Sequence, residues 1–134
     1  MVDRGWGRIV TISSAATLHP PGPLNSAYGT SKVAVNQPTR HLAAELAGSG
    51  VTANVIHPGE VKTAMWAAIQ AEAANTGREG TGLRDWAAAV GSSGGDDPQR
   101  AVELILSLVN GPLQATSGRF LWISGGHQAP IPSW

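Results

Sequence analysis

The sequence predicts an α/β fold built on a parallel sheet of about three strands with flanking helices. Two short runs rich in β-branched residues, 7–13 and 51–57, alternate with longer segments in which apolar residues recur at helical spacing. The connections between these runs are long enough to hold a helix, as parallel neighbours require. With 134 residues, 42% of them apolar, the chain is long enough to form one ordinary domain.

The first half of the chain predicts one strand and one long helix. Residues 7–13 are the strand, and residues 27–47 are the helix, with Asn25 and Ser26 as candidate caps. Gly48-Ser49-Gly50 ends this helix. Its apolar face is predicted at helical spacing, at Val35, Leu42 and Leu46.

Pro38 falls in the middle of this predicted helix. Proline removes a backbone hydrogen bond and its ring collides with the preceding turn, at a cost of about 3 kcal/mol. We therefore expect a kink or a local weakness at this point of the helix.

The second half alternates again. Residues 51–57 form the second predicted strand, closed by Pro58-Gly59, and residues 60–75 form an amphipathic helix. Its apolar stripe is Val61, Met65, Ile69 and Ala73. Residues 76–97 are expected to be a loop around a short alanine-rich turn at 85–90.

A final helix and strand complete the pattern. Asp97 followed by Pro98 is a favourable helix start, which predicts a helix over 98–109, and residues 119–124 form the third strand. The apolar positions of the helix are Val102, Ile105, Leu106 and Val109.

Composition narrows the classes of partner. Only 13% of the residues are charged, the net charge is zero, and no lysine–arginine cluster is present, so we expect no nucleic-acid partner. No apolar run is long enough to cross a bilayer, and no signal pattern opens the chain, so we expect no membrane partner and a cytoplasmic location. The chain has no cysteine, and its four histidines show no ligand spacing, which predicts no metal site.

Tyr28 and Lys32 suggest a specific chemistry. Positions four residues apart share one face of a helix, so the Lys32 ammonium can lie beside the Tyr28 phenol and favour its ionised form. A phenol with its pKa lowered in this way is a general acid/base at physiological pH. Ser14, at the end of the first strand, can hydrogen-bond a reacting oxygen. This combination suits the interconversion of an alcohol and a carbonyl.

Three motifs stand in the order and spacing of a known family. Gly-Arg-Ile-Val-Thr-Ile-Ser-Ser (7–14), Tyr-Gly-Thr-Ser-Lys (28–32) and Val-Ile-His-Pro-Gly-Glu-Val-Lys-Thr (55–63) resemble those of the short-chain dehydrogenase/reductase family, and the resemblance extends to about residue 126. It implies a partial Rossmann-like, doubly wound parallel sheet. The family's glycine-rich strand–turn–helix is absent, so residues 1–134 are expected to be a single partial domain, the catalytic and substrate-side half.

The same resemblance implies roles for individual residues. Ser14, Tyr28 and Lys32 would be catalytic, with the cofactor NAD or NADP and a small alcohol or ketone as substrate. The residues that would bind the cofactor are Tyr28, Lys32, Pro58, Gly59, Val61 and Thr63. The resemblance also implies a homo-oligomer for the full-length protein.

Two alternatives stay open at this point. The chain is either an oxidoreductase or a non-catalytic fragment that acts only as a dimerisation or interaction piece. Trp66 and Trp86 flank the segment that covers the substrate in the family, and they either line an apolar pocket or pack in the core.

Overall fold

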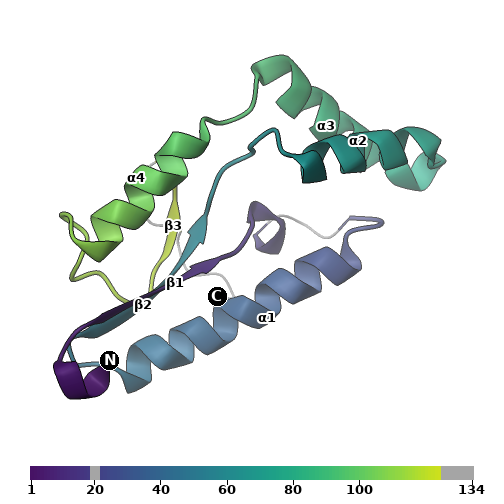
Figure 1. The fold of residues 1–134 in the computed structure, drawn as a ribbon. Coiled ribbons are helices and arrows are strands. Elements are labelled where there is room, and N and C mark those ends of the chain that lie inside the picture. Colours follow the sequence, from purple (N-terminus) through teal and green to yellow (C-terminus); the bar gives the residue numbers. More distant parts are fainter. Residues whose placement is uncertain (19–21, 125–134) are drawn as a thin grey trace.

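A computed structural model of the chain describes residues 1–18 and 22–124 and confirms the predicted α/β class (Figure 1). The sheet contains three parallel strands in the order β1-β2-β3. The strands are β1 (Gly7–Ile12), β2 (Val51–His57) and β3 (Phe120–Trp122). The helices are α1 (Ser26–Glu45), α2 (Ala64–Asn75), α3 (Thr81–Ser93) and α4 (Pro98–Val109), with short 3-10 turns η1 (Val2–Arg4), η2 (Ala15–Thr17) and η3 (Arg78–Gly80).

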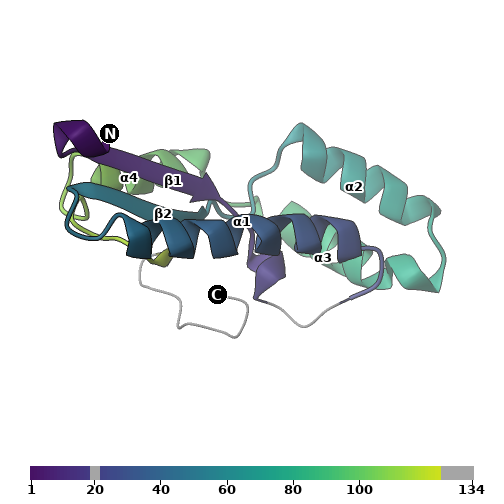
Figure 2. The ribbon, with the colours of Figure 1, turned by 90° about the horizontal axis from the view of Figure 1, so that it is seen from below.

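Helices cover both faces of the sheet. α1 runs along one face and α4 along the other, while α2 and α3 form a hairpin beyond the carboxyl ends of the strands (Figures 1 and 2). Successive strand residues point to opposite faces of the sheet, so Val55 and Ile56 belong to two separate hydrophobic cores. Val55 packs with Phe120 and, around them, Leu18 and Trp122. The core under α4 consists of Ile56, Leu108 and Leu121, with Val10, Leu104, Ile105 and Leu113 around them.

The buried face of α1 differs from the predicted apolar stripe. Its fully buried side chains are Asn36 and Thr39, whereas Leu42 is 37% exposed. The Thr39 hydroxyl lies 2.9 Å from that of Thr11 and also donates to the Val35 carbonyl at 2.8 Å. α1 therefore contacts the sheet through hydrogen-bonded polar groups. Pro38 lies inside α1, which continues through it.

The expectation of a loop over 76–97 is wrong, because α3 occupies most of that segment. Ala87 and Val90 are both 1% exposed, and the Trp66 indole donates to the Ala87 carbonyl at 3.3 Å. Arg84 donates to the Ala73 and Thr76 carbonyls at the end of α2. α3 is thus stabilised by packing against α2 more than by its own sequence signals.

α2 begins later than the predicted helix over 60–75. Thr63 is its N-cap, since its hydroxyl accepts the Trp66 amide at 3.3 Å. Val61 therefore lies outside the helix. Within the predicted stripe, Met65 is 59% exposed and only Ala73 is fully buried.

α4 has the predicted bounds and the predicted start. The Asp97 carboxylate accepts the Gln99 amide at 2.9 Å, and Pro98 occupies the first turn. Two of its predicted apolar positions, Val102 and Leu106, are 45% and 52% exposed, and Leu108 is the buried residue instead. β3 is shorter than the predicted 119–124.

Candidate functional site

The carboxyl end of β1 leads directly to two serines with different surroundings. Ser13 is 2% exposed, and its hydroxyl donates to the Lys32 carbonyl at 3.5 Å. Ser14 is half-buried and is the N-cap of η2, where its hydroxyl accepts the Ala16 amide at 3.1 Å. A hydroxyl carries one donor as well as acceptor lone pairs, so the Ser14 proton is available to another oxygen.

The first turns of α1 lie beside this end of β1. Tyr28 is 39% exposed, and the Lys32 ammonium lies 5.7 Å from the centre of its ring. Lys32 also donates to the Ile12 carbonyl at 3.2 Å, at the last position of β1. A Cβ on Gly29 would lie 4.0 Å from the Ala16 carbonyl oxygen, so α1 passes close to η2. The fold thus places the Tyr28–Lys32 segment next to the turn that carries Ser14.

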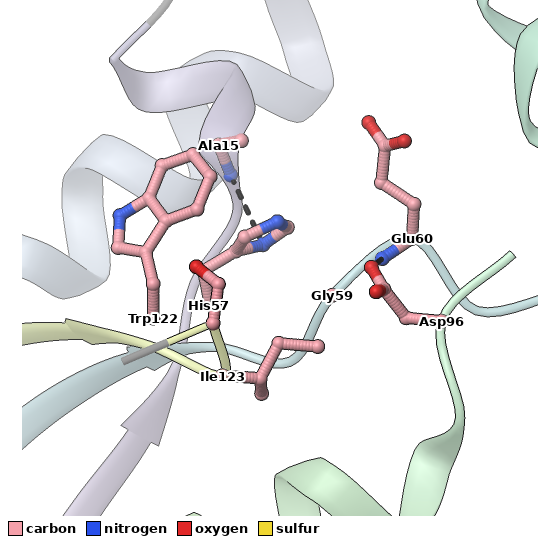
Figure 3. Close-up of a pocket in the computed structure, with 8 residues that line it drawn as sticks. Ala15, His57, Gly59, Glu60, Asp96, Trp122 and Ile123 are labelled. Atoms are coloured by element: carbon pink, nitrogen blue, oxygen red, sulfur yellow. Dashed lines mark hydrogen bonds between the residues drawn. The ribbon is translucent and has the colours of Figure 1, made fainter. Parts of the chain in front are cut away.

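A pocket of about 350 Å³ opens at the carboxyl ends of β2 and β3 (Figure 3). Ligands of open α/β sheets bind at this edge. The lining residues are Ala15, His57, Gly59, Glu60, Asp96, Trp122, Ile123 and Ser124. Gly59 is the one predicted cofactor residue among these described lining residues.

His57 forms the inner part of this pocket. It is 6% exposed, its Nδ1 accepts the Ala15 amide at 3.3 Å, and its ring meets the Trp122 indole edge-on at 4.6 Å (Figure 3). The sequence prediction missed His57, Glu60, Asp96 and Trp122 as lining residues. The available signal was a histidine at the last position of the strand, directly before Pro58-Gly59.

The turn after β2 requires a glycine. Gly59 has φ +88°, and a Cβ there would collide with Ile123 and lie 2.8 Å from the Asp96 carboxylate. The Glu60 amide donates to Asp96 Oδ2 at 2.8 Å, and the Asp96 amide donates to the Glu60 carbonyl at 3.0 Å. This Glu60–Asp96 pair closes the base of the α2–α3 hairpin.

The other predicted cofactor residues lie around this turn. Pro58 and Val61 are half-buried in the segment that joins β2 to α2, and Thr63 is exposed at the start of α2. The Trp86 indole donates to the Glu60 carboxylate at 3.0 Å, and Trp66 bonds across to α3. Both tryptophans therefore serve hairpin packing, and neither is among the described residues that line the pocket.

Residues 1–18 and 22–124 contain neither a group of metal-ligating side chains nor a helix that could span a membrane. No three metal-ligating side chains gather there. His19 and His127, two of the four histidines, lie outside the described residues. In the same ranges, no helix combines the length and the apolarity needed to cross a bilayer.

Proteins of one known family are similar to this chain in sequence. The family model described as short chain dehydrogenase matches residues 1–74. A short-chain type dehydrogenase/reductase of Picea abies is 47% identical over 74 residues, which cover 55% of this chain and 27% of that protein. L-2,3-butanediol dehydrogenase of Corynebacterium glutamicum is 30% identical over 122 residues, covering 90% of this chain and 47% of that protein.

A solved structure extends the likeness to the fold. The crystal structure of a variant of actinorhodin polyketide ketoreductase with NADPH superposes with a TM-score of 0.73 and 28% identity, over 91% of this chain and 47% of that chain. The chain spans less than half the length of each of these three proteins. Because the family model covers more than half of its residues, the chain belongs to the short-chain dehydrogenase family.

Proposed function

We propose that the chain is the catalytic and substrate-side half of an oxidoreductase that moves a hydride between NAD or NADP and an alcohol or carbonyl substrate. The observation that carries this proposal is the placement of Lys32. Its ammonium donates a hydrogen bond to the carbonyl of Ile12, the last residue of β1, at 3.2 Å. It also lies 5.7 Å from the centre of the Tyr28 ring, beside the turn that carries Ser14.

The three side chains have complementary roles. Tyr28 gives a proton to the substrate oxygen or takes one from it, and its 39% exposure leaves the phenol accessible. The Lys32 ammonium supports negative charge on that phenol. Ser14 donates a hydrogen bond to the same substrate oxygen with the proton that its contact to Ala16 leaves available.

The residues at the carboxyl ends of the strands fit a nicotinamide cofactor. When bound, the nicotinamide supplies or receives the hydride. Pro58 and Gly59 would border it, Val61 would offer its backbone, and Lys32 and Tyr28 would contact its ribose. The Thr63 hydroxyl accepts the Trp66 amide and so retains a proton to donate, which fits contact with the carboxamide or a phosphate.

The finer parts of the proposal concern the whole protein. Residues 1–134 form one partial domain of a cytoplasmic homo-oligomer, and its substrate is a small alcohol or ketone. The names of the relatives, which include acetoacetyl-CoA reductase and D-beta-hydroxybutyrate dehydrogenase, support this class of substrate.

Tyr28→Phe tests the proposed chemistry in a chain completed with the cofactor-binding half of a relative. Phenylalanine preserves packing but has no proton to transfer, so turnover should fall by about 10²–10⁴-fold while cofactor affinity stays unchanged. Steady-state assays with NADH and NADPH measure the rate, and fluorescence titration measures the affinity. Retention of more than about a tenth of the wild-type turnover would contradict the assigned mechanism.

A non-catalytic interaction piece is the second candidate. Among the described residues β1 pairs with β2 alone, so its other edge is open to a partner strand. If the completed wild-type chain shows no turnover but the 134-residue chain binds an intact family subunit, this candidate replaces the first.

A further inference from the structure

The turn that follows Ser14 is held from two sides. On the side of β2, the Ala15 amide donates to His57 Nδ1 at 3.3 Å, with both residues buried. On the side of α1, the Asn36 amide donates to the Thr17 hydroxyl at 3.3 Å, which in turn donates to the Ser14 carbonyl at 2.9 Å. The backbone on which Ser14 is mounted is thus fixed by one contact from each element.

Of the two contacts, the one to His57 is the one that rests on a residue of the sheet. The His57 ring meets the Trp122 indole edge-on, with 70° between the two planes, so the indole limits rotation of the imidazole on that side (Figure 3). His57 follows Ile56, which is fully buried, and precedes the Pro58-Gly59 turn. An Nδ1 that accepts a hydrogen bond requires the neutral imidazole with its proton on Nε2.

We propose that His57 is a positioning residue for Ser14: by accepting the Ala15 amide it fixes the turn that aims the Ser14 hydroxyl, and it ties that turn to the end of β2. The role assigned to His57 rests on the proposed function through Ser14, although the contact itself does not. A displacement of about 1 Å in a reacting group can cost 10²-fold in rate, so a hydrogen bond that fixes the backbone next to Ser14 should affect turnover.

Protonation of His57 would release the turn. An imidazolium donates from both nitrogens and cannot accept the Ala15 amide. The titratable groups that share the pocket with His57 are Glu60 and Asp96. Asp96 accepts the Glu60 amide and pairs with Arg100 at 3.4 Å, while Glu60 accepts the Trp86 indole. The position of the Ser14 turn should therefore depend on the charge of His57.

Two variants of similar size distinguish the effect of the His57 hydrogen bond from the effect of the volume of its side chain. In His57→Asn, the side-chain oxygen is bonded to Cγ as Nδ1 is, so an acceptor remains and does not titrate. In His57→Leu, a methyl group takes that place and the Ala15 amide loses its partner. Residue-resolved hydrogen exchange on the completed chain should show the Ala15 amide exchanging about five- to tenfold faster in His57→Leu and near wild type in His57→Asn.

If His57→Leu fails to fold, the pH dependence of the Ala15 amide resonance in the wild type still tests the proposal. The Ala15 amide resonance should follow the titration of the His57 ring in the wild type and lose that dependence in His57→Asn. An Ala15 amide that ignores the His57 titration, or one that stays protected in His57→Leu, would overturn the proposal.

Kinetics of the completed chain test the consequence for Ser14. His57→Leu should lower kcat about tenfold or more with little change in the KM for cofactor, and His57→Asn should restore most of the rate. Equal losses in both variants would show that His57 acts through packing and overturn the positioning role. If the wild type itself has no turnover, the proposed function fails, whereas the exchange measurement still decides whether His57 holds the turn.

Discussion

At the scale of the residue, neighbours of the same type acquire different tasks from their surroundings. Ser13 and Ser14 are adjacent, yet Ser13 is buried against α1 and Ser14 is half-buried at the start of η2. The pairing of Tyr28 with Lys32 could be predicted because i,i+4 spacing on a helix is local. The contact between Ala15 and His57 spans 42 residues, and no local pattern predicts such a pair.

Lys32→Ala and Ser14→Ala should fail in different ways in the completed chain. In the proposed mechanism Lys32 serves both the phenol and the cofactor, so its loss should reduce turnover by about 10²-fold or more and also weaken cofactor binding. In the proposed mechanism Ser14 contacts the substrate oxygen and not the cofactor, so its loss should reduce turnover by a similar factor and leave cofactor affinity nearly unchanged.

Paired measurements of kcat and of the cofactor Kd distinguish these two signatures. Ser13→Ala is the matched control for Ser14→Ala, because the Ser13 hydroxyl is turned to the Lys32 carbonyl. The same drop in both quantities for all three variants would indicate general unfolding instead.

At the scale of the element, strong local signals predicted the structure well and tertiary packing supplied the rest. The Asp97-Pro98 start fixed α4, and the β-branched run fixed β2 from Val51 to His57. α3 could not be predicted because Gly82 and Gly91 lower its intrinsic helix propensity. Contacts with α2 stabilise it instead: Arg84 of α3 donates to the Ala73 carbonyl, and Trp66 of α2 donates to the Ala87 carbonyl. The buried face of α1 was mispredicted because Asn36 and Thr39 are polar residues that form hydrogen bonds with residues far away in the sequence, Thr17 and Thr11.

Replacing Pro38 should stabilise α1. Pro38 is exposed inside the helix, so Pro38→Ala restores a backbone donor and removes the ring without disturbing the core. We expect a gain of up to about 3 kcal/mol in the free energy of unfolding. The midpoint of urea unfolding measures it, with Gln37→Ala as the neighbouring control that should change stability by less than about 0.5 kcal/mol. Equal midpoints for wild type and Pro38→Ala would show that α1 is already bent to suit the proline.

At the scale of the whole molecule, two small cores support a sheet with an open edge. Each core has only two or three fully buried apolar residues, and β1 pairs with β2 alone among the described residues. An open parallel edge with exposed apolar side chains favours pairing between chains. The 134-residue chain alone should therefore self-associate or unfold at low denaturant.

Sedimentation velocity over a range of concentrations checks this expectation. Ile12→Lys places a charge on the β1 edge, where Ile12 is 42% exposed, and should reduce the associated fraction. Leu106→Lys, at a 52% exposed position on α4, is the control and should not. A monomer with a sharp, reversible melt would contradict the prediction, and a larger effect of Leu106→Lys would place the contact on α4.

The chain alone should also bind NADH and NADPH weakly or not at all. It lacks a glycine-rich turn between a strand and a helix, which supplies the anion site for a pyrophosphate. Apart from Thr63, which would contact the carboxamide or a phosphate, the residues proposed to hold the cofactor would contact its nicotinamide and the adjoining ribose. Calorimetric titration of a monodisperse sample measures the affinity, and saturable binding in the micromolar range would refute this prediction.

The Glu60–Asp96 pair marks the boundary between the α2–α3 hairpin and the rest of the fold. The chain passes from β2 through Glu60 into the hairpin and comes back at Asp96, just before α4, and the two hydrogen bonds between these residues close a ring around α2 and α3. Apart from Val61 and Thr63, the proposed cofactor contacts, we expect the segment inside that ring to tolerate changes in length or sequence while the strands keep their register. A graft that is cut at these two residues and keeps Val61 and Thr63 should therefore replace the hairpin beside the pocket and leave Ser14, Tyr28 and Lys32, the proposed catalytic residues, in place.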